Sequence, residues 1–358
     1  MTSYILEKIG YALLTLLGVV TAIFLLFSVL PGDPARMMLD QNENSEQLAI
    51  IKKKYGFDQP LTKQYLYYLN DLSPISLHSQ NTDDYTFWDS EKYNGIEIIT
   101  FKNTSLAFKT PYLRESFQKS GKKVSQIIGQ TLPNTFILAF VAISIAIFLG
   151  IILGIVSARF KDTPLDRGIA IVSTLGMSIP SFFSAILFAF LFGFLWHETT
   201  GLNMTGSLYE VDDFGTGSYI QIKNIILPAI VLGIRPLAVI IQLMRNSLLD
   251  TMSQDYIRTA RAKGLSEFKI IKNHALKNSL NPVVTAISGW FASMLAGSVF
   301  VEYIFGWNGL GKEIVEALNH LDLPVIMGSV LVIATTFVVI NIMVDFVYAY
   351  LDPKIRMK

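Results

Sequence analysis

The stretch Asn134–Ala158, NTFILAFVAISIAIFLGIILGIVSA, contains no charged residue. A helix needs about 20 mostly apolar residues to cross the hydrocarbon core of a bilayer, and this stretch is longer than that. An amphipathic surface helix would show polar residues at every turn, and this pattern is missing here. The stretch therefore predicts a membrane-spanning helix.

Five other segments have the same character. With the first, the set is Ile9–Leu30, Asn134–Ala158, Gly168–Trp196, Ile225–Leu243, Pro282–Val301 and Leu323–Val344. Only 16% of the residues are charged, against roughly 25% in soluble domains. One such segment could be a buried helix of a large soluble protein, but six in one chain argue against that. We predict an all-α membrane protein with six transmembrane helices.

The positions of lysine and arginine predict the orientation, because short cytosolic loops carry an excess of them. The short loops at 197–224 and 302–322 are acidic, whereas three other segments are basic: 159–167, 245–277 and 354–358. This alternation predicts a multi-pass inner-membrane protein with both termini in the cytosol. The expected parts are an N-terminal helix 1–30, an extracytoplasmic region 31–132, a core 133–352 with a cytosolic loop 246–281, and a cytosolic tail 353–358.

The extracytoplasmic region is mixed in character. The first helix should be retained before it, because Val29–Pro34 has no small-x-small cleavage pattern. Residues 45–68 are typical of helix interrupted at Pro60. Residues 73–110 are more polar, and the run Ile96–Phe101 predicts a small strand pair there.

Enzyme chemistry has little support in this chain. It contains no cysteine and only four histidines, which are far apart in sequence, so no metal site and no catalytic residue is expected. The stretch Gly306–Glu313, GWNGLGKE, nearly fits a phosphate-binding loop. However, Glu313 replaces the Ser or Thr that would bind Mg²⁺, and no strand precedes the motif, so we expect a glycine-rich turn. We expect no cofactor and no nucleic-acid partner.

The most informative motif is Asp255–Glu267, DYIRTARAKGLSE, in the loop 246–281. Its composition favours a short helix that ends at Gly264 in a left-handed conformation, followed by a second helix capped by Ser266. A short helix on a cytosolic loop suits a groove on a soluble partner. A basic loop that contacts anionic lipid headgroups is an equal alternative on these grounds.

This motif resembles the "EAA" loop of binding-protein-dependent ABC importer permeases, in the variant of their peptide branch. The matching positions are Asp255, Tyr256, Arg258, Thr259, Ala260, Arg261, Ala262, Lys263, Gly264 and Leu265. Further resemblances to the dipeptide and oligopeptide permeases lie at Ile9–Ala35, which contains LPGDP near its end, and at Ser178–Phe182, Gly297–Glu302, Phe305–Gly311 and Asp352–Lys354. Residues 73–110 resemble nothing in that family, so they are expected to be an insertion.

The resemblance implies the fold of a type I ABC importer permease and a role as a non-enzymatic pore subunit. The implied partners are a second homologous permease, two cytosolic ATPases that dock on the loop, an extracytoplasmic solute-binding protein and membrane lipid. The small side chains Ala260 and Ala262 are expected to allow close approach of the ATPase. Peptides are the expected substrate, while nickel complexes and glutathione are alternatives within the same family.

Two residues within the predicted helices have alternative roles. Arg235 is the only charged residue inside a segment, and such a residue normally faces protein or a wet cavity. It either lines the transport pathway or pairs with carbonyls or the partner subunit, and Pro236 favours pairing because it leaves a carbonyl without a donor. Pro180 predicts a kink that either shapes the pore or serves packing.

The sequence disfavours two other classes of protein. An ion-coupled secondary transporter would use carboxylates or histidines inside the membrane, often with internal repeats. The six segments contain no carboxylate and no histidine, and the sequence shows no internal repeat. An intramembrane enzyme would need a nucleophile motif, and none is found.

Overall fold

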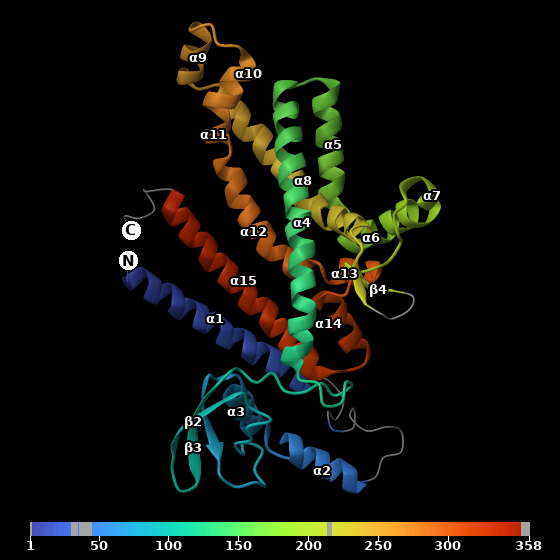
Figure 1. Cartoon of the computed structure of the whole chain (residues 1–358). Coiled ribbons are helices and arrows are strands. Elements are labelled where there is room, and N and C mark those ends of the chain that lie inside the picture. The colour runs from blue at the N-terminus through green and yellow to red at the C-terminus, as the bar shows by residue number, and fades with distance from the viewer. Residues whose placement is uncertain (1, 30–34, 36–44, 213–216, 352–358) are drawn as a thin grey trace. The chain divides into compact units, whose positions relative to one another are not determined.

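The computed structural model describes residues 2–29, 35, 45–212 and 217–351. They form two compact units (Figure 1). The first unit contains residues 1–130 and 316–335, and the second contains residues 131–315 and 336–358. The N-terminal helix therefore packs with the region that follows it. The predicted tail 353–358 lies outside the described residues.

Four helices are long and apolar enough to cross a membrane, or up to six if each of two bent helix pairs is one span. The four spans lie within α1 (Thr2–Val29), α4 (Val124–Arg159), α8 (Lys223–Met252) and α15 (Leu323–Leu351). The bent pairs are α5 (Pro164–Ser178) with α6 and η2 (Ser181–Leu195), and α12 (Asn281–Gly297) with α13 (Val299–Phe305). These six match the six predicted segments in position.

The break at Pro180 is larger than the expected kink, because α5 and the following helix differ in direction by 108°. Ile179 and Pro180 both have extended backbone, and Pro180 is the N-cap of α6. The residue before a proline is pushed out of the helical region. Proline does not always have this effect, since Pro133 in α4 and Pro236 in α8 lie inside continuous helices.

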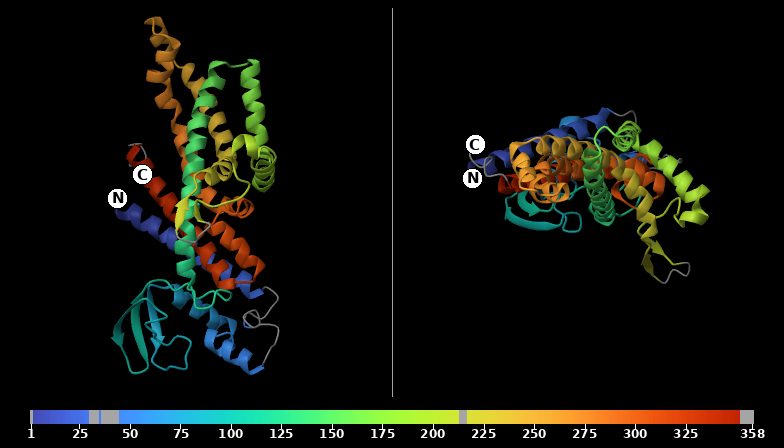
Figure 2. Two further views of the ribbon diagram at one scale, coloured as in Figure 1. Left: turned by 45° about the vertical axis from the view of Figure 1, so that its right-hand side comes forward. Right: turned by 90° about the horizontal axis from the view of Figure 1, so that it is seen from above.

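The core of the second unit is built from α4, α6, α8, α12 and α13 around Trp307 and Phe305, which are almost completely buried. The indole Nε1 of Trp307 donates to the carbonyl oxygen of Asn134 at 3.1 Å. In Figure 1 and in the left view of Figure 2, the upper parts of α4, α5 and α8 lie side by side. Between η2 and α8 lie the short elements α7 (His197–Thr200), β4 (Tyr209–Val211) and β5 (Ser218–Ile220).

The glycine-rich stretch 306–313 forms a turn after α13 at 306–309, as predicted, and continues into the first turn of α14 (Leu310–Asn319). Its backbone N–H groups bind a group of the chain itself, because the buried carboxylate of Glu302 accepts from Gly311 N at 2.7 Å and Lys312 N at 3.3 Å. A Cβ at Gly309 would lie 2.3 Å from that carboxylate. The resemblance to a phosphate-binding loop thus arises from an internal helix cap.

The first unit contains α2 (Ser45–Tyr55) and α3 (Leu61–Leu72), separated at Pro60 as predicted. It also contains a three-stranded antiparallel sheet in the order β1-β3-β2, made of β1 (Ile75–Ser79), β2 (Gly95–Thr100) and β3 (Thr104–Lys109). The predicted strand pair is the hairpin β2–β3. The strand β1 was not predicted.

Asp71 organises the polar interior of this unit. Its carboxylate is fully buried and accepts from Tyr85 Oη at 2.6 Å and Arg114 Nε at 3.1 Å. The Lys109 ammonium group donates to the Asp71 carbonyl oxygen. Burial lowers the pKa of Lys109 and of the neighbouring Lys92 to about 8. The residues 73–110 are thereby connected to α3 through buried ionic and polar groups.

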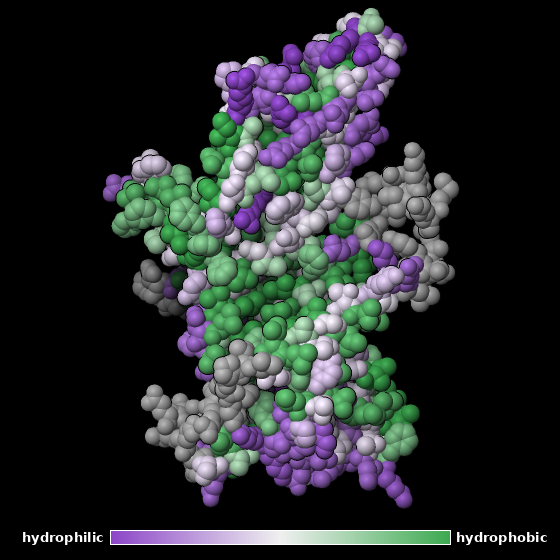
Figure 3. Space-filling model, turned by 180° about the vertical axis from the view of Figure 1, so that it is seen from behind, coloured by the Kyte–Doolittle hydropathy of each residue, from purple (hydrophilic) through white to green (hydrophobic). Residues whose placement is uncertain are grey.

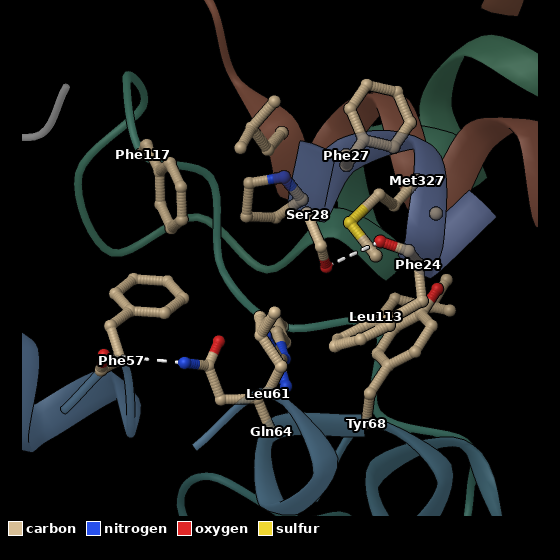
Figure 4. A pocket seen from close by; sticks show the side chains of 14 residues that line it. Phe24, Phe27, Ser28, Phe57, Leu61, Gln64, Tyr68, Leu113, Phe117 and Met327 are labelled. Atoms are coloured by element: carbon tan, nitrogen blue, oxygen red, sulfur yellow. Dashed lines mark hydrogen bonds between the residues drawn. The ribbon is translucent and has the colours of Figure 1, made fainter. Parts of the chain in front are cut away.

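The C-terminal part of α1 packs on α3. Thr21 Oγ1 lies 2.6 Å from the hydroxyl of Tyr65, and the ring of Phe24 lies against those of Tyr65 and Tyr68. A cavity of about 170 Å³ lies at this junction, and Phe57 and Leu61 also line it (Figure 4). The Tyr68 hydroxyl is buried beside it without a hydrogen-bond partner. These contacts connect α1 to the sheet through α3.

Candidate docking site

The loop that resembles the EAA loop is a chain of short helices between α8 and α12. They are α9 (Asp255–Ala262), α10 (Glu267–Ile270), η3 (Ile271–Ala275) and α11 (Leu276–Ser279). Gly264 has a φ of +78°, so the predicted left-handed junction after α9 is confirmed. Ser266 is the N-cap of α10, but its side chain makes no capping hydrogen bond.

One face of α9 is buried within the chain. Ile257 and Ala260 are three residues apart, so they lie on the same helix face, and both are buried against Met244, Leu248 and Ile270. The expectation that Ala260 offers a small surface to a partner is therefore wrong. Its small side chain instead allows α9 to pack closely on the chain's own helices.

The opposite face of α9 is exposed and polar. Its exposed residues are Asp255, Tyr256, Arg258, Thr259, Arg261, Ala262 and Lys263, while Leu265 after the junction is half-buried. Arg258 contacts Asp255 at 3.2 Å on the surface, and Arg261 Nε donates to Glu267 Oε1 at 2.8 Å. The hydrogen bond from Arg261 lowers the pKa of Glu267. The pair Arg261–Glu267 connects α9 to α10 across Gly264.

The structure adds one residue that the sequence pattern did not indicate. Phe268 in α10 is 73% exposed, although its neighbour Ile270 is fully buried. Large exposed aromatic side chains are typical anchors of protein interfaces. The available signal was a phenylalanine between Glu267 and Lys269 in an otherwise polar segment.

The loop is joined to the membrane helices by polar contacts. Ser279 Oγ lies 3.1 Å from Thr251 Oγ1, which connects α11 to the end of α8. Further along α8, Arg245 donates twice to the Asp166 carboxylate, with both distances 2.7 Å. Ser157 Oγ donates to the same carboxylate at 2.5 Å. The ends of α4, α5 and α8 are therefore connected next to the loop.

Arg235 is on an exposed face of α8. It lines a cavity of about 90 Å³ together with Ile179 and Ser181 at the α5–α6 break and with Trp290 of α12. Within the described ranges, neither a carbonyl nor a carboxylate bonds to it. The structure thus brings together Arg235 and the break at Pro180, and both are remote in sequence from the loop.

The fold and this loop define a polytopic membrane protein with an exposed helical element between α8 and α12. The family model described as binding-protein-dependent transport system inner membrane component matches residues 150–357, and the corresponding N-terminal model matches residues 1–85. The chain therefore belongs to the family of binding-protein-dependent transport system inner membrane components, the permease subunits of ABC importers.

Curated relatives match over the whole length. The di/tripeptide transport system permease of Pseudomonas aeruginosa is 30% identical, with 99% of each chain covered. The dipeptide transport system permeases of Escherichia coli and Lactococcus lactis are 30% and 32% identical, with 100% of each chain covered. Whether residues 73–110 are an insertion stays a prediction, because the two family models leave residues 86–149 unmatched.

A solved structure supports the fold. The methionine ABC transporter MetNI in inward-facing conformations matches with a TM-score of 0.50 and 16% identity. The match covers 64% of this chain and 97% of the other. This likeness supports a mostly helical permease fold, and the ABC importer class itself rests on the family model and the full-length relatives.

Proposed function

We propose that this chain forms half of the pathway by which an ATP-driven importer moves di- or oligopeptides across the inner membrane. The observation that carries the proposal is the exposed α9–Gly264–α10 element, held on the membrane helices by a buried apolar face. The relatives that match over the full chain are dipeptide and di/tripeptide permeases, which supports peptides as the substrate.

The loop 246–281 is the proposed docking element for a cytosolic ATPase. The exposed face of α9 offers Tyr256, Arg258 and Arg261, and Phe268 offers an apolar anchor beside them. Arginine side chains suit charge-assisted hydrogen bonds at the rim of an interface. Movement of the ATPase would reach α8 and α12 directly, because the loop is continuous with both helices.

The proposed assembly contains a second permease, two ATPases and an extracytoplasmic solute-binding protein. The N-terminus and C-terminus lie in the cytosol in this arrangement, and the first unit receives the binding protein. Reporter fusions test the orientation: a fusion at Asn273 should report cytosol and one at Asn81 the exterior. The opposite result at Asn273 would remove the loop from the ATPases and overturn the proposal.

Arg235 and Pro180 are the proposed pathway residues. The exposed guanidinium beside the α5–α6 break suits the carboxylate that every peptide substrate carries. In that case, Arg235→Gln should assemble normally and transport poorly, whereas a pairing role with the second permease would make the complex unstable in detergent. A variant with normal stability and normal transport would contradict both roles.

The substrate is tested with the complete complex in proteoliposomes. ATP-dependent uptake of labelled dipeptides and short peptides is measured with the cognate binding protein outside. Unlabelled peptides should compete for uptake, whereas nickel complexes and glutathione should not. Uptake of nickel complexes or glutathione without peptide uptake would replace the proposed substrate and leave the role of the loop intact.

A further inference from the structure

The three-stranded sheet of the first unit has an unusual distribution of side chains. Its inner face is polar, since Ser76, His78 and Ser105 are almost fully buried. Its outer face is apolar, with six large side chains about half exposed or more. These are Ile75, Leu77, Ile96, Ile98, Ile99 and Phe108. A sheet with one side in water normally has the reverse pattern.

The strand register gathers the apolar side chains into one surface. Phe108 of β3 is opposite Ile75 of β1 and Ile96 of β2, which gives one row across the sheet. Leu106 is opposite Leu77 and Ile99 in the next row. Directly opposed residues and residues two apart on a strand share a face. We call these two rows the apolar sheet face.

The end of the β2–β3 hairpin extends this surface. Phe101 is 59% exposed, and the next residue is Lys102, which is also exposed. A bulge between Glu97 and Ile99 adds Ile98 to the exposed apolar side chains. Figure 3 shows hydrophobic residues at the side of this unit and hydrophilic residues below them. An aromatic residue followed by a lysine suits the boundary between acyl chains and phosphates.

The sheet is attached close to the point where α1 leaves the membrane. Phe24 and Thr21 of α1 contact α3, and Asn70 near the end of α3 forms two hydrogen bonds with the backbone of Leu77, both 2.9 Å. The 12 residues of α3 span about 18 Å at 1.5 Å per residue. In Figures 1 and 2 the sheet is on the side of this unit toward which the N-terminal half of α1 extends.

α1 has its own lipid-facing surface in the same unit. Its exposed large apolar side chains include Leu13, Leu14, Leu17, Leu25 and Leu26. We propose that the apolar sheet face rests on the lipid headgroup and acyl-chain boundary of the leaflet at which α1 ends, and so continues the lipid contact of α1. In the orientation proposed above this is the outer leaflet, and the contact fixes the direction in which the first unit presents its remaining, polar surface.

Site-directed spin labelling tests this contact, and the chain contains no cysteine that would interfere. Single cysteines are introduced by Ile96→Cys and Phe108→Cys, and the complete complex is placed in nanodiscs of phosphatidylethanolamine and phosphatidylglycerol. The control is Glu97→Cys, because Glu97 is exposed on the same strand but belongs to the opposite face. Collision of each label with oxygen and with a water-soluble nickel chelate is measured.

The expected result is a several-fold higher ratio of oxygen to nickel-chelate collision at positions 96 and 108 than at position 97. Equal, water-like ratios at all three positions would overturn the proposal. Protection that appears only after the solute-binding protein is added would assign the face to that protein instead. Protection from both reagents before any addition would assign it to another protein subunit, and would equally contradict a lipid contact.

Discussion

The loop 246–281 and the three-stranded sheet are both small elements attached to membrane helices, but they sort their side chains in opposite ways. In α9 the apolar Ile257 and Ala260 face inward and the charged residues face outward. In the sheet, Ser76 and His78 face inward while Ile75 and Leu77 face outward. The first pattern suits a soluble partner with polar rim contacts, and the second suits an apolar environment.

The two regions are held together by different interactions. The loop is held by burial of small and aliphatic side chains against α8, with a few polar contacts at its base. The sheet is held by hydrogen bonds and ion pairs around Asp71. Substitutions and pH should therefore affect the two regions differently.

The largest effect is expected where charge is buried beside the loop. Asp166→Asn leaves Arg245 without its partner, and breaking a buried ion pair costs about 3 kcal/mol at the lower end of the usual range. Arg245 is partly exposed, which favours that lower end. Thermal unfolding of the purified complex measures the loss. Asp255→Asn is the control, because the Asp255–Arg258 pair is exposed and should contribute less than about 1 kcal/mol. Equal losses would show that the buried pair has no special role.

A smaller effect is expected at the junction between α9 and α10. Gly264→Val places a β-branched residue at a φ of +78°, which costs roughly 1–2 kcal/mol of backbone strain. The added Cβ has no atom within 4 Å, so the strain is confined to the backbone. The variant should insert normally but lose coupling between ATP turnover and uptake in proteoliposomes. Gly264→Asn should retain most coupling because asparagine tolerates this conformation. If both variants behave alike, the angle between α9 and α10 at Gly264 is not important for coupling.

The smallest effect is expected from pH on the sheet. Burial lowers the pKa of His78, whose ring packs edge-on against the stacked rings of Trp88 and Tyr93. The two ring nitrogens hydrogen-bond with Ser76 Oγ and the Thr86 carbonyl oxygen. The unfolded chain then binds more protons, so stability falls as the pH decreases below about 6.5. The free energy of unfolding should change by at most about 1.4 kcal/mol per pH unit through this one group. The lowered pKa values of Lys92 and Lys109 also make the folded chain less stable as the pH decreases, in their case from about 10 to about 8.

Limited proteolysis of the first unit at pH 7.5 and 5.5 measures this slope. The chain should be cleaved faster between β1 and β3 at pH 5.5, and His78→Gln should make cleavage nearly independent of pH in this range. Cleavage sites in the loop 246–281 serve as the internal comparison, because the burial of Ile257 and Ala260 involves no titration. A wild-type sheet that resists cleavage equally at both pH values would contradict the described environment of His78.

The sequence predicted the positions of the four spans and the two bent helix pairs, because long uncharged runs have few alternative structures. It also predicted Gly264 correctly, because glycine after a helical run marks a left-handed end. It could not predict β1, since the alternation of Ile75, Ser76, Leu77 and His78 fits a strand but gives no sign of which face is buried. The inward position of Ala260 was missed because a resemblance identifies residues without assigning them to a helix face.

The exposed position of Phe268 was missed for a similar reason. An apolar residue in a polar loop is equally consistent with burial and exposure, and only the packing of Ile270 and Ala275 shows which residues of this segment turn inward. The internal cap by Glu302 requires contacts across the α13–α14 turn that spacing alone does not reveal.

The most direct test of the central claim, that the loop is the docking element for the ATPase, is co-purification of the ATPases with a Phe268→Ala variant. Truncation of an aromatic interface anchor typically costs about 2 kcal/mol or more, so ATPase association should weaken at least about 30-fold. Phe160→Ala is the control, because Phe160 is also an exposed phenylalanine but lies in the α4–α5 turn. Association that is reduced by Phe268→Ala and not by Phe160→Ala is the predicted result. Full association and normal coupled uptake with Phe268→Ala combined with Arg258→Ala would contradict the account.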